Sequence, residues 1–172
     1  MKLIILPGNS KSNREWADKA ALAFSNEFED IYRQYYSHWE GDDADINFEI
    51  ELDKLVDNLG SDDYIIFAKS VGIIVTLYGI FRGKIKPKKC VFVGFPINMA
   101  LKEGFNVTSW LREFKIPTVL IQNSNDPITS FDDLKNYLEP LNKTNIELIE
   151  LEGDNHKYDD FELIKSKTLT FL

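Results

Sequence analysis

The sequence predicts an α/β protein built on one doubly wound, mostly parallel six-stranded sheet flanked by helices. Six short apolar runs of strand length alternate along the chain with longer segments of helical character. Turn residues separate the two kinds of segment, for example at Pro7-Gly8 and at Gly60. Because parallel strands need crossover connections, this alternation favours a parallel sheet, and 172 residues suit a single domain over 1–172.

Each predicted strand is a short run bounded by turn residues. The run 64–68 is apolar and aromatic throughout, as is typical of a buried strand. The run 29–36 alternates polar residues with aromatic ones. The six predicted strands are 2–6, 29–36, 64–68, 90–94, 118–122 and 146–151.

The predicted helices have start signals as well as apolar stripes. Ser12 and Glu15 have the spacing of a capping box, so a helix is expected to start there. Ser130 and Asp133 repeat this spacing. The segment 95–106 shows no clear periodicity and is expected to be irregular. The predicted helices are 12–24, 46–59, 71–81, 107–114, 130–141 and 158–172.

The segment 71–81 is rich in β-branched residues, and propensity alone favours a strand there. The neighbouring segments favour a helix instead. The flanking runs 64–68 and 90–94 are expected to be adjacent parallel strands, which must be joined by a right-handed crossover. We therefore predict a helix over 71–81.

A serine follows the central predicted strand, in the pattern Ala68-x-Ser70-x-Gly72. A strand, a sharp turn that bears a serine and a buried helix together form a nucleophile elbow, which exposes the hydroxyl above the sheet. Small neighbours are needed because backbones approach closely there. Ala68 stands where glycine is usual, and a methyl group is the smallest possible departure. An ordinary turn is the alternative interpretation of so short a pattern.

Two further polar turns favour the elbow over an ordinary turn. Asp126 follows the fifth predicted strand and His156 follows the sixth. In a parallel sheet the carboxyl ends of the strands share one edge, and ligands bind there, at the point where the strand order reverses. If the order begins 2-1-3, the turns at Asn9 and Ser70 flank that point. All four turns are then expected on one rim.

Each residue type has a chemical task at this rim. Serine is a poor nucleophile and needs an adjacent base, which an imidazole such as that of His156 can be. Asp126 would orient the ring and stabilise the imidazolium. The N–H groups of Asn9 and Val71 are candidate donors to an oxyanion.

A second carboxylate competes for the role of the acid. Asp154 lies only two residues before His156. We favour Asp126, because the acid of a triad must reach the far ring nitrogen from a separate turn.

Three motifs occur in the order serine, acid, histidine: Ala68-Lys69-Ser70-Val71-Gly72, Asn125-Asp126-Pro127 and Gly153-Asp154-Asn155-His156. In this order they resemble the α/β-hydrolase family over essentially the whole chain, in a trimmed form without the family's first two strands or a large lid. The chain is also similar to small serine hydrolases whose first strand ends in Pro-Gly-Asn. It departs from the family at Ala68 and in lacking a second glycine after Gly72. The resemblance implies a minimal α/β-hydrolase fold with nucleophile Ser70, acid Asp126, base His156 and oxyanion donors Asn9 and Val71.

Several further side chains are candidate contacts for a substrate. His38 is the only other histidine and is expected on the same rim, although a histidine in a surface loop is commonly without a role. Aromatic and methionine residues could line an acyl pocket, although such residues are as often part of the core: Trp39, Phe95, Met99, Phe105 and Trp110. Lys69 is interpreted as the polar, tolerant position inside the elbow.

Composition excludes several classes of partner. The net charge of −8 and the pI near 4.8 argue against nucleic acid, whose phosphates would be repelled. No Walker A or G-x-G-x-x-G pattern follows a strand, and the acidic run at Asp42, Asp43 and Asp45 lacks the Gly and Glu of a calcium loop. We expect no cofactor and no metal.

A single cysteine, Cys90, and an N-terminal apolar run too short for a signal peptide or a membrane span favour a cytoplasmic protein.

The sequence therefore supports a serine hydrolase that cleaves small carboxylic esters, thioesters or amides through an acyl-enzyme. Its partner would be a small-molecule acyl substrate. The alternative is an inactive, hydrolase-like binding module for a protein or a small molecule, because a fold does not imply an activity. A third hypothesis is a flavodoxin-like domain in which Ser70 is only structural.

Overall fold

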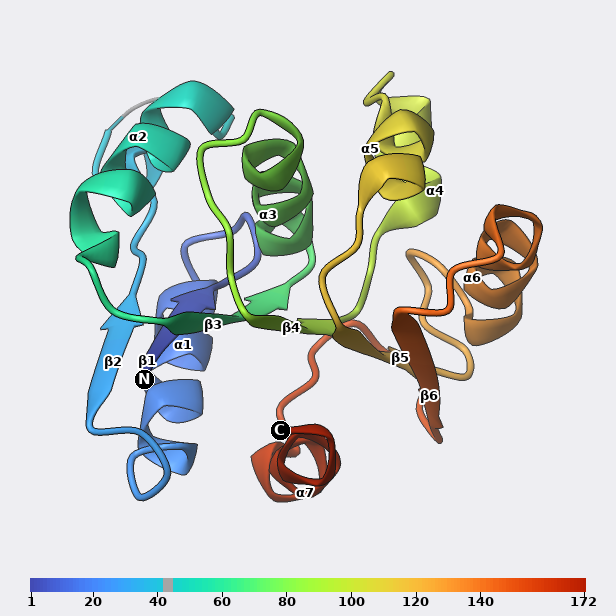
Figure 1. Ribbon diagram of the computed structural model, residues 1–172. Helices are drawn as coiled ribbons and strands as arrows, with labels where there is room; N and C mark the ends of the chain where they lie inside the picture. The colour runs from blue at the N-terminus through green and yellow to red at the C-terminus, as the bar shows by residue number, and fades with distance from the viewer. Residues whose placement is uncertain (42–44) are drawn as a thin grey trace.

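The computed structural model describes residues 1–41 and 45–172, and its described strands form one sheet (Figure 1). The strand order is β2-β1-β3-β4-β5-β6 and every neighbouring pair is parallel. This confirms the predicted doubly wound, parallel sheet, and the order begins 2-1-3, which is the condition under which the turns at Asn9 and Ser70 flank the point of reversal. The strands are β1 (Lys2–Leu6), β2 (Asp30–Arg33), β3 (Tyr64–Lys69), β4 (Lys89–Val93), β5 (Thr118–Asn123) and β6 (Ile146–Leu151).

Helices cover both faces of the sheet (Figure 1). On one face lie α1 (Asn13–Ala23) and α7 (Phe161–Phe171), which pack their apolar sides on alternate residues of the strands, such as Phe67 and Ile121. The opposite face packs against the other helices around residues such as Ile66 and Phe92. Those helices are α2 (Phe48–Leu59), α3 (Val71–Phe81), α4 (Ile97–Lys102), α5 (Val107–Glu113) and α6 (Phe131–Leu138), with short 3₁₀ turns η1 (Ser37–Trp39) and η2 (Glu139–Leu141).

The structure corrects the ends of several predicted elements, and for two of them the contacts show why. Strand β2 ends at Arg33 and not at residue 36, because the buried side chains of Gln34 and Tyr36 turn away to bind Glu51 and the Pro7 carbonyl. Helix α7 begins three residues later than predicted, since Tyr158 has φ +53° and is not helical.

Two smaller predictions were also wrong in detail. The segment 95–106 is not irregular throughout, because it contains α4. Ser12 precedes α1 but does not cap it, since its hydroxyl pairs with that of Ser10. Ser130, by contrast, accepts the Asp133 N–H at 3.1 Å. The predicted helix over 71–81 is confirmed as α3.

Helix α3 approaches the end of β1 unusually closely at Gly72. A Cβ atom at this position would lie 2.2 Å from the Leu6 carbonyl oxygen. Just before it, Ser70 has φ +52° and ψ −119°, a conformation that L residues rarely adopt. The chain therefore turns sharply between β3 and α3, and only a residue without a side chain fits at Gly72.

In the described part of the chain, no helix has both the length and the apolar character that a membrane span requires. Asp42 and Asp43 of the acidic run lie outside the described residues.

Replacing Gly72 with alanine should therefore lower the free energy of unfolding by about 3 kcal/mol, because a backbone carbonyl cannot move aside as a side chain can. Chemical denaturation measures this loss. Gly8→Ala is the control and should lose less stability: its Cβ would meet the tip of the Asn13 side chain at 2.9 Å, which can shift at the cost of its hydrogen bonds to Ser10 and Lys69. Equal losses in the two variants would contradict this account.

Candidate active site

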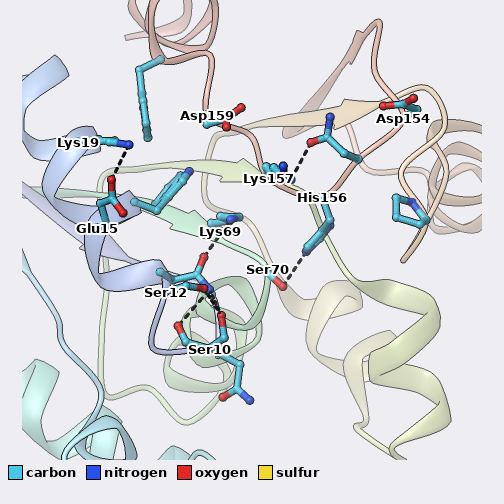
Figure 2. Close-up of a pocket in the computed structure, with 17 residues that line it drawn as sticks. Ser10, Ser12, Glu15, Lys19, Lys69, Ser70, Asp154, His156, Lys157 and Asp159 are labelled. Carbon is cyan, nitrogen blue, oxygen red and sulfur yellow. Dashed lines mark hydrogen bonds and ion pairs between the residues drawn. The ribbon is translucent and has the colours of Figure 1, made fainter.

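The structure brings together the side chains of Ser70, His156 and Asp126 (Figure 2 shows the first two). His156 Nε2 lies 2.9 Å from Ser70 Oγ, and His156 Nδ1 lies 2.7 Å from Asp126 Oδ2. Asp126 is buried, while Ser70 and His156 are partly exposed. The three side chains thus form one continuous line of hydrogen bonds that runs from the solvent-facing hydroxyl to a buried carboxylate.

The histidine reaches Ser70 because its loop crosses the end of β4. His156 follows β6, at one edge of the sheet, whereas Ser70 follows β3 near the middle. Gly94 lies under the crossing with φ +66°, and a Cβ there would lie 2.5 Å from Tyr158 Cε2 and 3.1 Å from His156 Cε1. Asn123 helps to fix the loop by donating its side-chain N–H to the Asn155 carbonyl at 2.8 Å. A side chain at position 94 would block this path.

The contacts of Asp126 require an ionised carboxylate. Asn123 N–H donates to the Tyr158 hydroxyl oxygen at 3.0 Å, so the phenolic hydrogen is directed to Asp126 Oδ2, 2.5 Å away. Oδ1 accepts the Ile128 N–H at 2.9 Å. Burial opposes the charge, but the hydrogen bonds from His156, Tyr158 and Ile128 outweigh it and hold the pKa of Asp126 below its ordinary value.

The charge on Asp126 sets the tautomer of His156. A carboxylate can only accept hydrogen bonds, so the Nδ1 atom of His156 must carry a hydrogen. In a neutral ring Nε2 then has a free lone pair, and it can accept the hydrogen of the Ser70 hydroxyl. The geometry therefore suits removal of a proton from Ser70.

Tyr158 is the member of this network that the sequence did not indicate. Burial and the neighbouring Asp126 raise the pKa of its hydroxyl, so the phenol remains a donor. Its backbone carbonyl also accepts the Trp16 indole N–H at 2.7 Å, which links the histidine loop to α1. The predicted helix over 158–172 concealed this role, and the only sequence signal is an aromatic residue two positions after His156.

The other candidate acid, Asp154, is exposed, and among the described contacts it is Asp126 and not Asp154 that bonds His156. Of the two predicted oxyanion donors, Asn9 lies in the loop after β1 and Val71 is the first residue of α3, directly after Ser70. In the described part of the chain neither N–H donates to another protein group. Both donors therefore remain available to a ligand.

Hydrogen bonds to the carbonyl oxygen of Asn9 hold the loop after β1 in place. That oxygen accepts the Trp39 indole N–H at 2.6 Å and pairs with His38 Nε2 at 2.9 Å. The structure thus places His38 and Trp39 behind the loop as supports. Phe95 is fully buried in the core, and Met99 lies on α4.

A hollow of about 680 Å³ opens beside Ser70 on the side of α1 and α7 (Figure 2). It is more polar than the predicted acyl pocket, and the predicted contacts His38, Trp39, Phe95 and Met99 are not part of its described lining. Lys69, interpreted above as a tolerant position, is instead a buried part of this lining. The residues that line the hollow are Gly8, Asn9, Ser10, Ser12, Asn13, Glu15, Trp16, Lys19, Lys69, Ser70, Pro127, Asp154, Asn155, His156, Lys157, Asp159 and Phe161.

Among the described residues, no group of three or more His, Cys, Asp or Glu side chains is arranged to hold a metal ion.

Solved structures match this chain over nearly its whole length, although no protein-family model and no curated protein matches it. An uncharacterized protein from Bacillus cereus has a TM-score of 0.73 at 16% identity, over 99% of this chain and 58% of that one. An esterase from Pyrococcus furiosus has a TM-score of 0.73 at 16% identity, over 99% of this chain and 79% of the other. The mouse alpha/beta hydrolase domain-containing protein 10 has a TM-score of 0.71 at 14% identity, over 98% of this chain and 87% of that one.

This likeness establishes the fold. The chain has the α/β-hydrolase fold, as its motifs predicted, and it spans little more than half of the Bacillus protein.

Replacing Tyr158 with phenylalanine should lower the free energy of unfolding by about 1–3 kcal/mol at neutral pH, since Asn123 N–H and Asp126 each lose a partner. The contribution of Asp126 depends on pH. Because its folded pKa is depressed, its hydrogen bonds stabilise the fold above the unfolded pKa of about 3.9, and this stability is lost as pH falls through the folded pKa. The difference in the free energy of unfolding between wild type and Tyr158→Phe should therefore become smaller in acid. Urea unfolding across a pH series measures this difference.

Tyr137→Phe is the matched control, because its hydroxyl pairs with that of Thr108 at 2.7 Å and, among the described contacts, with no carboxylate. The difference in the free energy of unfolding between Tyr137→Phe and wild type should not depend on pH. If the difference for Tyr158→Phe is equally independent of pH, the proposed link to Asp126 is contradicted.

Proposed function

We propose that this protein is a serine hydrolase that cleaves carboxylic esters, thioesters or amides of small acyl groups. The observation that carries the proposal is the unbroken line of hydrogen bonds from Ser70 through His156 to Asp126. Each atom in that line has the donor or acceptor character that acyl transfer requires. The esterase and hydrolase names of proteins that share the fold are consistent with this class of reaction.

In the first step Ser70 Oγ attacks the carbonyl carbon of the substrate. His156 Nε2 takes the hydroxyl proton as the new bond forms. The resulting imidazolium is stabilised by Asp126, whose charge Tyr158 and Ile128 keep in place. Because Asp126 is buried, this electrostatic stabilisation is weakened little by solvent.

The tetrahedral intermediate carries a negative oxygen that needs fixed donors. The N–H groups of Asn9 and Val71 serve this purpose, and the Val71 group also lies at the positive end of the dipole of α3. Each such donor contributes roughly 3–4 kcal/mol to stabilisation of the transition state. Donors held in place before the reaction need no reorganisation when the charge develops.

The intermediate then collapses to an acyl-enzyme. His156 gives its proton to the leaving group, and the bond between the carbonyl carbon and that group breaks. A water molecule, deprotonated by the same imidazole, then attacks the acyl carbon. The bond between that carbon and Ser70 Oγ breaks, His156 returns the proton to Ser70, and the acid leaves. The reaction needs no cofactor, because every proton transfer uses His156.

The direct test uses a small test ester and a phosphonate probe that labels activated serines. Wild type should hydrolyse the ester and take up the probe, and Ser70→Ala should do neither. His156→Ala should lower kcat by about 10⁴- to 10⁶-fold, because among the described contacts His156 alone bonds Ser70 Oγ and can accept its proton. Thermal unfolding of Ser70→Ala should stay close to wild type, and His156→Ala should remain folded with a loss no larger than the roughly 1–3 kcal/mol expected when buried Asp126 loses one partner.

Two control variants are available in the chain. Ser25→Ala removes an exposed hydroxyl and should leave both labelling and turnover unchanged. His38→Ala removes the other histidine and should lower kcat far less than His156→Ala, since Trp39 still binds the Asn9 carbonyl. Labelling that persists in Ser70→Ala, or a wild type that neither labels nor turns over esters, would favour a binding module.

A further inference from the structure

The residue immediately before Ser70 is a buried lysine. Lys69 ends β3, and only 6% of its surface is exposed although it lines the hollow. Its Nζ donates to Asn13 Oδ1 at 2.9 Å and lies 5.1 Å from the centre of the Trp16 ring. Figure 2 shows the side chain between Ser70 and the start of α1.

This ammonium group has unused capacity for hydrogen bonds. A lysine has three N–H donors, and among the described residues Asn13 alone accepts from Lys69. In the same part of the chain no carboxylate forms an ion pair with it. Burial lowers the pKa of Lys69 to about 8, although the charges of Asp159 and Asp126 favour the protonated form. At neutral pH the hollow therefore contains a buried, incompletely satisfied positive charge.

The other charged residues of the hollow do not cancel this charge. Lys19 pairs with Glu15 at 2.7 Å, so these two neutralise each other. Asp154, Asp159 and Lys157 are exposed, and neither Asp159 nor the buried Asp126 behind His156 forms an ion pair with Lys69 among the described contacts. Lys69 is thus the one buried charge in the described lining of the hollow, although the whole protein carries −8.

We infer that Lys69 binds a carboxylate group of the substrate, and that the preferred substrates are esters that carry a carboxylate besides the bond that is cleaved. The inference rests on the proposed function, because it concerns the same hollow beside Ser70. A carboxylate would accept the N–H groups that Asn13 leaves open and would compensate the buried charge. Charge-assisted hydrogen bonds of this kind are among the strongest in proteins.

Two matched pairs of esters test where the carboxylate lies. For the acyl side, phenyl hexanoate is compared with the monophenyl ester of adipic acid, which has the same number of acyl carbons. For the leaving-group side, the acetate ester of para-ethylphenol is compared with that of para-hydroxyphenylacetic acid. In wild type, kcat/KM for the carboxylate member of at least one pair should exceed that of its neutral partner by about tenfold or more.

The preference should depend on Lys69 and on its charge. Lys69→Met keeps the length of the side chain and should reduce the ratio of the two kcat/KM values by about 10- to 100-fold. Lys157→Met removes an exposed lysine from the same hollow and should change the ratio by less than about threefold. In wild type the ratio should also fall as pH rises through about 8, where free Lys69 loses its proton.

A binding measurement separates this inference from the proposed function. By calorimetry, Ser70→Ala should bind the carboxylate ester more tightly than its neutral partner, and Ser70→Ala with Lys69→Met should not. If no ester is turned over but this difference in binding appears, hydrolysis is overturned and the carboxylate site stands.

Two results would overturn the carboxylate site. The first is equal kcat/KM values, or equal affinities, within both pairs of esters in the presence of Lys69, and in that case Lys69 only joins β3 to α1. The second is an equal loss of preference in Lys157→Met, which would assign the preference to the general field of the hollow. Should Lys69→Met fail to fold, the wild-type ratios and their pH dependence decide the question.

Discussion

The contact on which the site depends is the approach of α3 to β1, where Gly72 lies against the Leu6 carbonyl. It forces the turn at Ser70, whose positive φ lifts the hydroxyl away from β3. The same contact keeps the end of β1 beside the end of β3, in the register that pairs Leu6 with Ala68. The Asn9 loop therefore begins next to Ser70. One close packing contact thus determines the positions of both the serine and the two backbone donors of the proposed mechanism.

Most of the fold could be predicted because its signals are local or follow from topology. The strand at 64–68 is recognisable by its apolar run, and the helical state of 71–81 follows from the crossover between parallel strands. The ends of β2 and α7 could not be predicted, because distant residues determine them. The Gln34 side chain binds Glu51, and Tyr158 takes a positive φ beside Gly94.

The same distinction applies to the candidate site. Ser70, Asp126 and His156 could be selected because each follows a strand, and parallel strands bring their carboxyl ends to one edge. Tyr158 and Lys69 could not, since their importance lies in burial and in partners far along the chain. Nothing in the sequence around Lys69 indicates that α1 covers it, or that the described hollow beside Ser70 is lined mainly by polar residues.

The support of the Asn9 carbonyl by His38 and Trp39 connects the site to the edge of the sheet. Those two residues belong to the turn after β2, and Glu51 anchors that turn by accepting the Ser37 N–H at 2.5 Å. In evolutionary terms, insertions and deletions in the outermost strand and its connection to α2 are then expected to affect function. Changes in length there would shift a peptide group beside the reacting carbonyl, so a peripheral segment becomes a place where turnover can be adjusted while Ser70 and His156 stay the same.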